Sequence, residues 1–575
     1  MRRGVRIKAP NPRPRTFYAH DVRDRFDAAL GFMASVGDDG VGLSQAQAHA
    51  DPVHGPHWIA AEQAELDSLT SKGTFDFCDV PKGHYAIRSH FVYKIKRRPD
   101  GSIDRYKARL VVNGNSQRPG TYGETYAPTA KLASVRLGIS LATIEDLDIH
   151  QMDVDSAFVQ ADVDEELYVR LPDGRTARLR KALYGLKQAS FAWYKAADTA
   201  FGTLGFKRTS ADECVYVNHS YKGHRIIILL YVDDLLIIAP PDADVPSLKI
   251  ALQAKWAMKD LGETSYFLGL EIKRDRPNRR TWVHQSAYAR DVLAVYGYGQ
   301  ANPASTPLVP STHLVPATDE ESAFVAKREL DADRPYARLV GSLQWLALAT
   351  RPDMAQAVSE LARFVAKPTD EHWHAAHHVL RYLNGTSSLG LLYGVPVEDE
   401  SARLFGWSDA DWAGCPTTRR SRTAYAFKYG HGAVSWSSRM QPTVSLSTVE
   451  AEFKALSEAA REGIWLVRLV GDLGRDHDGP LVLLNDNTGA EAVASNAANS
   501  SKLKHVALQY HFIRERVASG EIALEHTPTH RMAADSLTKA VPVPAHQRCL
   551  DQLRLDRAPD RSEQREPSTA ARAGV

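Results

Sequence analysis

The stretch that decides the fold is Ile226–Ala239, which reads IIILLYVDDLLIIA. Two short apolar runs flank Asp233 and Asp234, a pattern typical of two buried strands joined by a tight turn. The stretch is too short to span a bilayer, and two central carboxylates argue further against that. Adjacent carboxylates repel each other unless a cation neutralises them, and their hard oxygen atoms suit Mg²⁺. The alternative is a solvated turn whose aspartates only cap the hairpin.

The composition is that of a soluble globular chain. Its 575 residues suffice for about three or four domains, and 43% hydrophobic with 24% charged residues argues against global disorder. The net charge is only +2, so overall basicity does not indicate a nucleic-acid partner. Four widely spaced cysteines form no zinc or disulfide pattern, which fits a reducing compartment inside the cell. We expect no signal peptide and no membrane partner.

A basic hairpin is predicted in the N-terminal part. Residues 90–114, HFVYKIKRRPDGSIDRYKARLVVNG, alternate apolar with basic side chains and contain the turn PDG. The basic side chains that would share one exposed face are Lys94, Lys96, Lys107 and Arg109. Such a face is either a solvated surface or a clamp on nucleotide or template phosphates.

A third carboxylate completes a candidate metal site. Asp153 lies on a short predicted strand, in the segment IHQMDVDSAF, about 80 residues before the Asp233–Asp234 turn. In an antiparallel sheet these elements can lie side by side. Three carboxylates could then hold two Mg²⁺ ions, which can activate a primer 3′-hydroxyl and stabilise the leaving pyrophosphate.

A second set of carboxylates follows in a predicted α/β domain. Strands dominate its first half, and helices and strands alternate afterwards, which predicts one mixed sheet. Its carboxylates fall at predicted strand ends and helix starts: Asp409, Glu452, Asp486 and Asp535. Any one of them is a common cap or turn residue, but four at corresponding ends would bind two hard metals and activate water against a phosphodiester. Two such sites in one chain indicate polymerisation coupled to nucleic-acid hydrolysis.

The motifs around these residues resemble the reverse transcriptase and ribonuclease H part of a copia-type long-terminal-repeat retrotransposon polyprotein. Among them are RYKARLVVNG, QMDVDSAFVQADVDEELYV, LYGLKQASFAWY, YVDDLLI, YFLGLEI, WSDADWAG, STVEAEFKAL and ADSLTK, in the family's order over about residues 56–542. The resemblance implies an α+β and α/β multidomain fold with right-hand polymerase palm and fingers, a helical connection and a ribonuclease H-like domain. It also implies Mg²⁺, two ions per site, with Mn²⁺ as a substitute. The implied partners are an RNA template, a DNA primer–template, an RNA–DNA hybrid and deoxynucleoside triphosphates, with the oligomeric state open.

The resemblance and the composition together divide the chain into five parts. These are a flexible leader or linker (1–50), fingers and palm (51–300), a helical thumb or connection (301–400), the ribonuclease H-like domain (401–545) and a disordered tail (546–575). Within them we expect a turn at 258–264, one strand over Tyr266–Ile272, helices over 336–385, and a strand in TVSLSTVE (443–450).

Residue roles carry over only to matched positions. Asp153, Asp233 and Asp234 match the polymerase metal ligands, and the second set matches the ribonuclease H ligands, with Glu450 as the alternative to Glu452. Residues implied to contact nucleotide or primer are Lys107, Arg109, Phe158, Tyr184, Gly185, Lys187, Phe267, Leu268 and Gly269. Phe158 matches the aromatic residue that excludes a ribose 2′-hydroxyl; core packing is its alternative role.

Two rival interpretations remain open. One is a non-enzymatic relic that binds nucleic acid without polymerising, and the other is a nuclease that uses only the C-terminal domain. The intact YVDD and Asp153 argue against the nuclease, and primer extension on an RNA template separates the relic from an enzyme.

Overall fold

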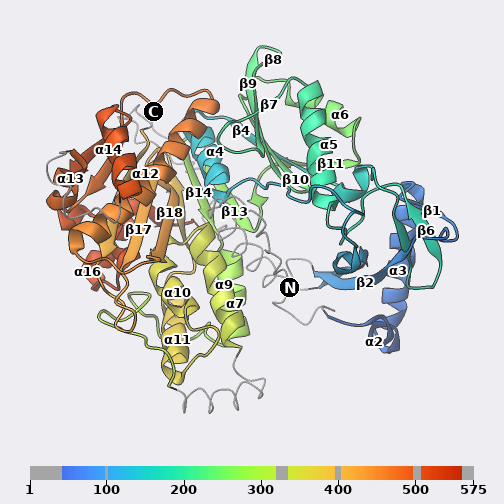
Figure 1. Cartoon of the computed structure of the whole chain (residues 1–575), viewed down its shortest axis with the longest axis horizontal. Helices are drawn as coiled ribbons and strands as arrows, with labels where there is room; N and C mark the ends of the chain where they lie inside the picture. Colours follow the sequence, from blue (N-terminus) through green and yellow to red (C-terminus); the bar gives the residue numbers. More distant parts are fainter. Residues whose placement is uncertain (1–41, 98–101, 319–334, 395–402, 496–506, 560–575) are drawn as a thin grey trace, which may run out of the picture.

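In the part of the chain that the computed structural model describes, helices lie between four β-sheets (Figure 1). The structure describes residues 42–97, 102–318, 335–394, 403–495 and 507–559. The fold is mixed α+β and α/β over several domains, as predicted. The predicted leader up to residue 41, the PDG turn and the predicted tail beyond residue 559 lie outside the described residues.

The N-terminal sheet has the strand order β1-β6-β5-β2-β3. Its elements are α2 (Gln45–Ala50), α3 (Gly55–Ser71), β1 (Phe75–Phe77), β2 (Ala86–Arg97), β3 (Ile103–Val112), η1 (Gly114–Ser116), β5 (Tyr168–Arg170) and β6 (Thr176–Leu179). Buried Tyr93 packs against α3, and on the opposite face of the β2–β3 hairpin Lys94 lies directly across from Lys107. The predicted strand pair and its basic face are therefore confirmed. Ser44 caps α2, so the prediction of a flexible leader is wrong for residues 45–50.

The central sheet, in the order β11-β4-β10-β9-β8-β7, contains the stretch that decides the fold. Its elements are α4 (Leu132–Ile144), β4 (Asp148–Val154), η2 (Ala157–Gln160), α5 (Ala189–Thr203), β7 (Lys207–Arg208), β8 (Val215–Tyr221), β9 (His224–Tyr231), β10 (Asp234–Ala239), α6 (Val245–Gln253) and β11 (Met258–Glu263). Ile227 and Leu229 of β9 share a core with α4, whereas Ile226 and Ile228 share one with α5 and α6. Both faces are covered, which is why β9 and β10 are apolar at nearly every position. The turn predicted at 258–264 is wrong, because β11 pairs there with β4.

A third sheet, in the order β12-β13-β14-β15-β21, joins distant parts of the chain. It consists of β12 (Tyr266–Phe267), β13 (Leu270–Asp275), β14 (Arg280–His284), β15 (Leu389–Tyr393) and β21 (Leu555–Arg557). In place of one continuous strand over Tyr266–Ile272 the chain forms a hairpin, because Leu268 and Gly269 have positive φ angles of 50° and 79° and turn it back on itself.

Two predictions about the later chain are also corrected by this sheet. The 301–400 part is not only helical, since β15 pairs with β14. The tail predicted as disordered from residue 546 is ordered up to residue 559, because α16 (Val543–Leu553) buries Leu550 and Leu553 and β21 then pairs with β15.

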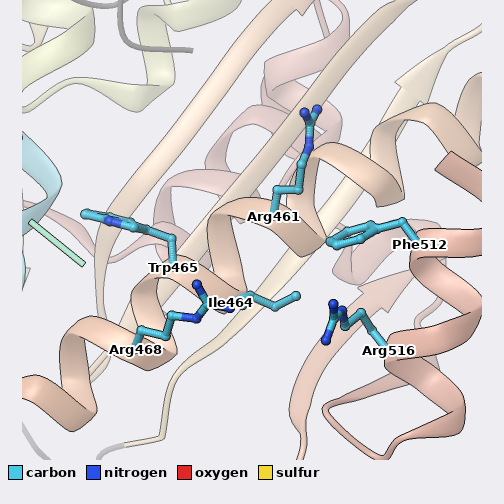
Figure 2. A pocket seen from close by; sticks show the side chains of 6 residues that line it. All are labelled: Arg461, Ile464, Trp465, Arg468, Phe512 and Arg516. Atoms are coloured by element: carbon cyan, nitrogen blue, oxygen red, sulfur yellow. The ribbon is translucent and has the colours of Figure 1, made fainter. Parts of the chain in front are cut away.

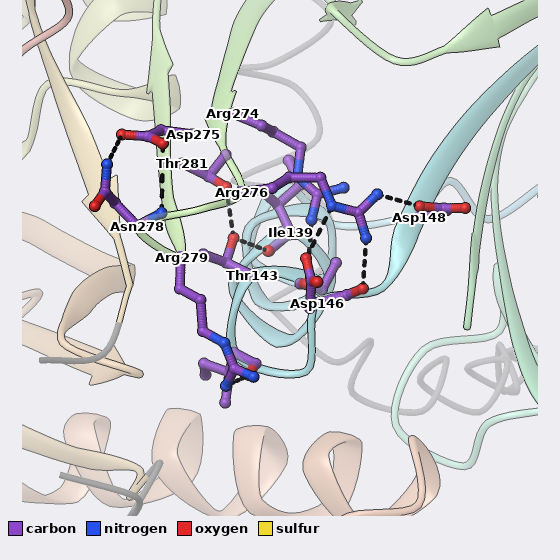
Figure 3. A network of polar contacts seen from close by, with 12 residues as sticks. Ile139, Thr143, Asp146, Asp148, Arg274, Asp275, Arg276, Asn278, Arg279 and Thr281 are labelled. Atoms are coloured by element: carbon purple, nitrogen blue, oxygen red, sulfur yellow. Dashed lines mark hydrogen bonds and ion pairs between the residues drawn. The ribbon is translucent and has the colours of Figure 1, made fainter. Parts of the chain in front are cut away.

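The turn between β13 and β14 is tied to the start of the central sheet. Arg276 donates from Nε to Asp146 at 2.9 Å and also pairs with Asp148 at the start of β4 (Figure 3). Thr143 of α4 and Thr281 of β14 are joined by a hydroxyl–hydroxyl hydrogen bond of 2.8 Å. The third sheet is therefore fixed against the central sheet by polar contacts as well as by apolar packing.

The helices predicted over 336–385 are confirmed. They are α9 (Tyr336–Ala349), η3 (Pro352–Met354), α10 (Ala355–Ala362) and α11 (Asp370–Gly385), and they share a core with α7 (Ser286–Val295). No helix within the described residues is long and apolar enough to cross a membrane. All four cysteines are free thiols.

The C-terminal sheet has the order β18-β17-β16-β19-β20, with β16, β19 and β20 parallel and β17 and β18 antiparallel to their neighbours. This is the predicted mixed sheet. Its elements are β16 (Phe405–Asp411), β17 (Arg422–Tyr429), β18 (Gly432–Met440), α12 (Thr448–Asp472), β19 (Leu481–Asn485), α13 (Thr488–Ser495), α14 (Ala507–Ala518), β20 (Ile522–His526), η6 (Thr529–Arg531) and α15 (Asp535–Thr538). The strand predicted in TVSLSTVE is wrong, because Ser447 accepts a hydrogen bond from the amide of Glu450 and caps α12.

Helix α4 lies between the central and C-terminal sheets (Figure 1). Buried Arg136 donates from Nε to the carbonyl oxygen of Val434 in β18 at 2.7 Å. Its Nη1 donates to the carbonyl oxygens of Leu348 and Ala349 in α9 at 2.9 and 3.0 Å, and its guanidinium lies 4.0 Å from the ring centroid of Trp436. One side chain thus joins three parts of the chain.

The far end of α12 also contacts the central domain. Trp465 donates to the carbonyl oxygen of Ala211 at 2.6 Å, and Asp472 accepts from the amide and hydroxyl of Ser210 at 2.7 and 2.9 Å. Beside Trp465, a cleft of about 190 Å³ separates α12 from α14, and Phe512 projects into it from α14 (Figure 2). The C-terminal domain therefore rests on the central domain at both α4 and α12.

Replacing Arg136 should destabilise this junction. We expect Arg136→Met to lower the free energy of unfolding by about 3 kcal/mol, because three buried carbonyl oxygens lose their donor. Thermal unfolding of the purified chain measures the change. The matched control is Arg170→Met, which removes an exposed arginine from β5; equal effects of the two variants would contradict the role assigned to Arg136.

Candidate functional site

The first carboxylate set lies where β4, β9 and β10 meet. Asp153 and Asp234 are direct partners across the β4–β10 pair. Asp233 belongs to the turn before β10, and its carbonyl oxygen accepts from the amide of Val154 at 2.8 Å. Val232 has a φ of 55°, and its carbonyl oxygen accepts from the indole of Trp193 at 2.6 Å. The structure thus brings the three predicted aspartates to one end of the central sheet, although their carboxylate oxygen atoms do not all lie within 4.8 Å of one another.

Burial and repulsion disfavour the charged forms of Asp153 and Asp234. Burial, followed by the charge of Asp233, raises the pKa of Asp234 to about 6, although the amide of Gln151 donates to it at 3.2 Å. Burial and Asp233 also raise the pKa of Asp153. An arrangement that costs energy when ionised, and that offers only hard oxygen atoms, fits a divalent cation such as Mg²⁺ or Mn²⁺.

Asp155 adds a negative charge two residues after Asp153, and a lysine compensates this charge. Asp155 follows β4 and accepts a hydrogen bond from Lys259 of β11 at 2.6 Å. Lys259 therefore lowers the pKa of Asp153 more than Asp155 raises it. Lys259 lies outside the quoted motifs, and although Gln151 begins one of them, only the pairing of β11 and β10 with β4 reveals the roles of both residues.

The basic face of the β2–β3 hairpin is electrostatically coupled to the first carboxylate set. Lys107 helps to lower the pKa of Asp153, and the charge of Asp153 acts on Lys96 in turn. Arg109 lies over the ring of Tyr184 with its guanidinium carbon 5.0 Å from the centroid. Cations that act on a carboxylate cluster in this way can bind phosphate groups beside it.

Four further residues predicted to contact the nucleotide are Phe158, Tyr184, Gly185 and Lys187. Phe158 and Tyr184 are half-buried, and their rings meet edge-to-face with centroids 4.9 Å apart. Gly185 has a φ of 91°, and a Cβ there would lie 2.0 Å from the carbonyl oxygen of Val112, so only glycine fits. Lys187 instead points to the 117–122 segment, where its ammonium lies 3.2 Å from the hydroxyl of Tyr122.

The β12–β13 hairpin corrects one predicted primer contact. Phe267 is fully buried in the main core, so its side chain packs inside the protein and is not available to a primer. Leu268 and Gly269 form the turn of the hairpin and are partly exposed. They remain candidate primer contacts.

The second carboxylate set lies on the C-terminal sheet. Asp409, Glu452 and Asp486 each offer an oxygen atom within 4.8 Å of the others, and no other group of three or more potential ligands meets this condition among the described residues. Asp409 lies within β16, Glu452 in the second turn of α12, and Asp486 directly after β19. Strands β16 and β19 are parallel neighbours, so their carboxyl ends meet at one edge.

The same electrostatic pattern recurs here. Burial raises the pKa of Asp409 to about 6 and, together with the charge of Asp409, raises the pKa of Glu452 to about 9. Asn485 donates to Glu452 at 3.2 Å. Glu450 instead forms an ion pair with Lys454 at 2.7 Å, so Glu452 is the member of the set.

Asp535 stands slightly apart from this cluster. It begins α15 and forms an ion pair of 2.6 Å with Lys539, four residues later. It is close enough to raise the pKa of Asp409. Thr538 of the same helix and Thr529 of η6 place hydroxyl groups 2.5 Å from Asp409 and 2.9 Å from Asp486.

The raised pKa values predict how Mg²⁺ binding depends on pH. The folded-state pKa of Asp234 and of Asp409 is about 6, above the value of about 4 for an unfolded carboxyl group. The metal-free chain should therefore lose stability as the pH rises from about 4 through 6. Because Mg²⁺ binds the ionised form, it should raise the melting temperature more at pH 7 than at pH 5.

The Asp234→Asn, Asp409→Asn double variant is the control for this measurement, and most of the pH-dependent gain should disappear in it. An equal Mg²⁺ effect at both pH values in the parent chain would contradict the assignment of these carboxylates as metal ligands.

The chain is similar in sequence to known proteins. The reverse transcriptase (RNA-dependent DNA polymerase) family matches residues 72–310. The chain is 38% identical to the retrovirus-related Pol polyprotein from transposon TNT 1-94 of Nicotiana tabacum, over 84% of this chain and 37% of the polyprotein. It is 35% identical to the corresponding polyprotein from transposon RE1 of Arabidopsis thaliana, over 87% of this chain and 34% of that one. It thus spans about a third of the length of these curated relatives.

A shorter relative is covered completely. A transposon Ty5-1 protein of Saccharomyces cerevisiae is 31% identical over 54% of this chain and 100% of its own length. Among solved structures, the foamy viral protease-reverse transcriptase in complex with RNA/DNA hybrid is 11% identical with a TM-score of 0.45, over 82% of this chain and 54% of that chain. The chain belongs to the reverse transcriptase family of copia-type retrotransposon Pol polyproteins.

Proposed function

We propose that the chain is an RNA-directed DNA polymerase that also cleaves the RNA strand of RNA–DNA hybrids, inside the cell. Its substrates would be deoxynucleoside triphosphates, an RNA or DNA template with a DNA primer, and the hybrid. The observation that carries the polymerase assignment is the direct pairing of Asp153 with Asp234 beside Asp233, coupled to the charge of Lys107. For hybrid cleavage it is the oxygen cluster of Asp409, Glu452 and Asp486.

In the polymerase reaction the chain's residues bind and orient. Asp153, Asp233 and Asp234 would hold two divalent ions, which when bound supply activation of the primer hydroxyl and charge neutralisation of the pyrophosphate. Lys107 and Arg109 offer charge-assisted hydrogen bonds to the triphosphate. Phe158 would lie against the incoming sugar.

In hybrid cleavage the second set would play the corresponding part. Asp409, Glu452 and Asp486, with Asp535 beside them, would hold the divalent ions that supply an activated water. Asn485 orients Glu452 by its hydrogen bond, and α15 brings Asp535 to the same edge. Two sites built from different residues should be separable by substitution.

Substituting one ligand in each set tests this separation. Asp233→Asn should reduce primer extension by orders of magnitude while hybrid cleavage persists, and Asp486→Asn should do the reverse. Each change removes a charged ligand without changing the volume of the side chain. The measurement uses one primed RNA template and one labelled hybrid with the same protein preparation.

Equal loss of both activities in both variants, with melting temperatures unchanged, would show that the sites are not separable. Full primer extension by Asp233→Asn would show that Asp233 and Asp234 are only turn residues. A parent chain that binds hybrid but does neither reaction would support the nucleic-acid-binding relic.

Sugar selection by Phe158 is a separate prediction. Phe158→Ala should increase ribonucleotide incorporation relative to deoxynucleotide incorporation, because it removes a ring that would collide with the 2′-hydroxyl. Single-nucleotide incorporation on one template gives the ratio. Tyr194→Phe, on α5, where the hydroxyl group contacts Arg208 and Glu213, is the aromatic control. An unchanged ratio in Phe158→Ala would assign Phe158 to the core.

A further inference from the structure

The short helix α15 touches the second carboxylate set through a buried hydroxyl. Thr538, its last residue, is 1% exposed, and its Oγ1 lies 2.5 Å from Oδ2 of Asp409, which is 5% exposed. The same hydroxyl lies 2.9 Å from the carbonyl oxygen of Asp535. At this depth, water cannot easily replace the threonine as the partner of Asp409.

The hydroxyl has one hydrogen atom and can donate it to only one of these two acceptors. The carboxylate is the nearer one, and hydrogen bonds from hydroxyl groups to ionised oxygens are typically about 2.5–2.7 Å long. The hydrogen therefore goes to Oδ2 of Asp409. This bond fixes the rotation of the carboxylate and leaves its other oxygen, Oδ1, available as a ligand.

The next residue, Lys539, interacts more weakly with the second carboxylate set. Lys539 pairs with Asp535, but its side chain is 48% exposed, so solvent screens that ion pair. Mg²⁺ demands near-octahedral geometry, so the orientation of each ligand decides how tightly it binds. Loss of a side chain that orients a ligand typically costs about 10–100-fold in metal affinity or activity.

We propose that Thr538 is a positioning residue of the second set, which orients the Asp409 carboxylate so that divalent ions bind tightly enough for hybrid cleavage. This inference rests on the proposed ribonuclease H function of the same site. It requires the hydroxyl group specifically, so serine should replace threonine and valine should not.

The test measures metal binding without substrate. Mn²⁺ binding is followed by electron paramagnetic resonance in the full chain carrying Asp233→Asn, so that the first set contributes little. Thr538→Val keeps the shape of the side chain without the hydroxyl and should weaken Mn²⁺ binding about tenfold or more. Thr538→Ser should stay near the parent. Thr143→Val, which removes a buried hydroxyl between α4 and β14, is the matched control and should leave binding unchanged.

A second arm uses activity in chains with Asp233 intact. Thr538→Val should raise the Mg²⁺ concentration needed for half-maximal hybrid cleavage while primer extension stays normal, which also shows that the variant is folded. Unchanged Mn²⁺ affinity in Thr538→Val would overturn the proposal, and so would equal weakening by valine and serine. If the parent binds Mn²⁺ at the second set but cleaves no hybrid, the proposed function fails, whereas the difference between valine and serine in Mn²⁺ affinity still decides the role of Thr538.

Discussion

Repulsion between closely placed, partly buried carboxylates shapes both candidate sites. In each, burial is the largest cause of the raised pKa values, and neighbouring carboxylates add to it, as for Asp234 and for Glu452. A protein that keeps such groups together without a cation carries a cost in stability at neutral pH. Nearby donors, Gln151 in the first site and Asn485 in the second, reduce this cost and fix orientation. The remaining charge is what a divalent ion would neutralise.

The two sites are held in one framework by helix α4. Its faces pack against the central sheet and against β17 and β18, and Arg136 reaches both the C-terminal sheet and α9. Contacts of α12 with Ser210 and Ala211 add a second attachment. A nucleic acid bound at both carboxylate sets would therefore meet them at a spacing set by packed secondary structure rather than by a linker.

The sequence alone predicts that the first carboxylate set comes together, and part of the rest. The continuous apolar run around Asp233 indicates strands buried on both faces, and the motif order indicates the partners of Asp153. Strand register, which the sequence does not specify, decides which side chains meet. The sequence predicts a turn where β11 pairs with β4, and so it does not reveal the contact of Lys259 with Asp155. Phe267 illustrates a second limit, because a motif match does not distinguish a surface aromatic residue from a core one. The charge of the last residues predicts a disordered tail, whereas a few buried leucines pack α16 and β21 against the core.

The central claim is that both carboxylate sets hold divalent ions in the same folded chain. Anomalous X-ray diffraction from crystals of the chain grown with Mn²⁺ and an RNA–DNA hybrid tests it most directly. The account predicts anomalous peaks within bonding distance of Asp153 and Asp234 and, separately, of Asp409, Glu452 and Asp486. Peaks at only one set, or at neither, in crystals where both sets are ordered would contradict it.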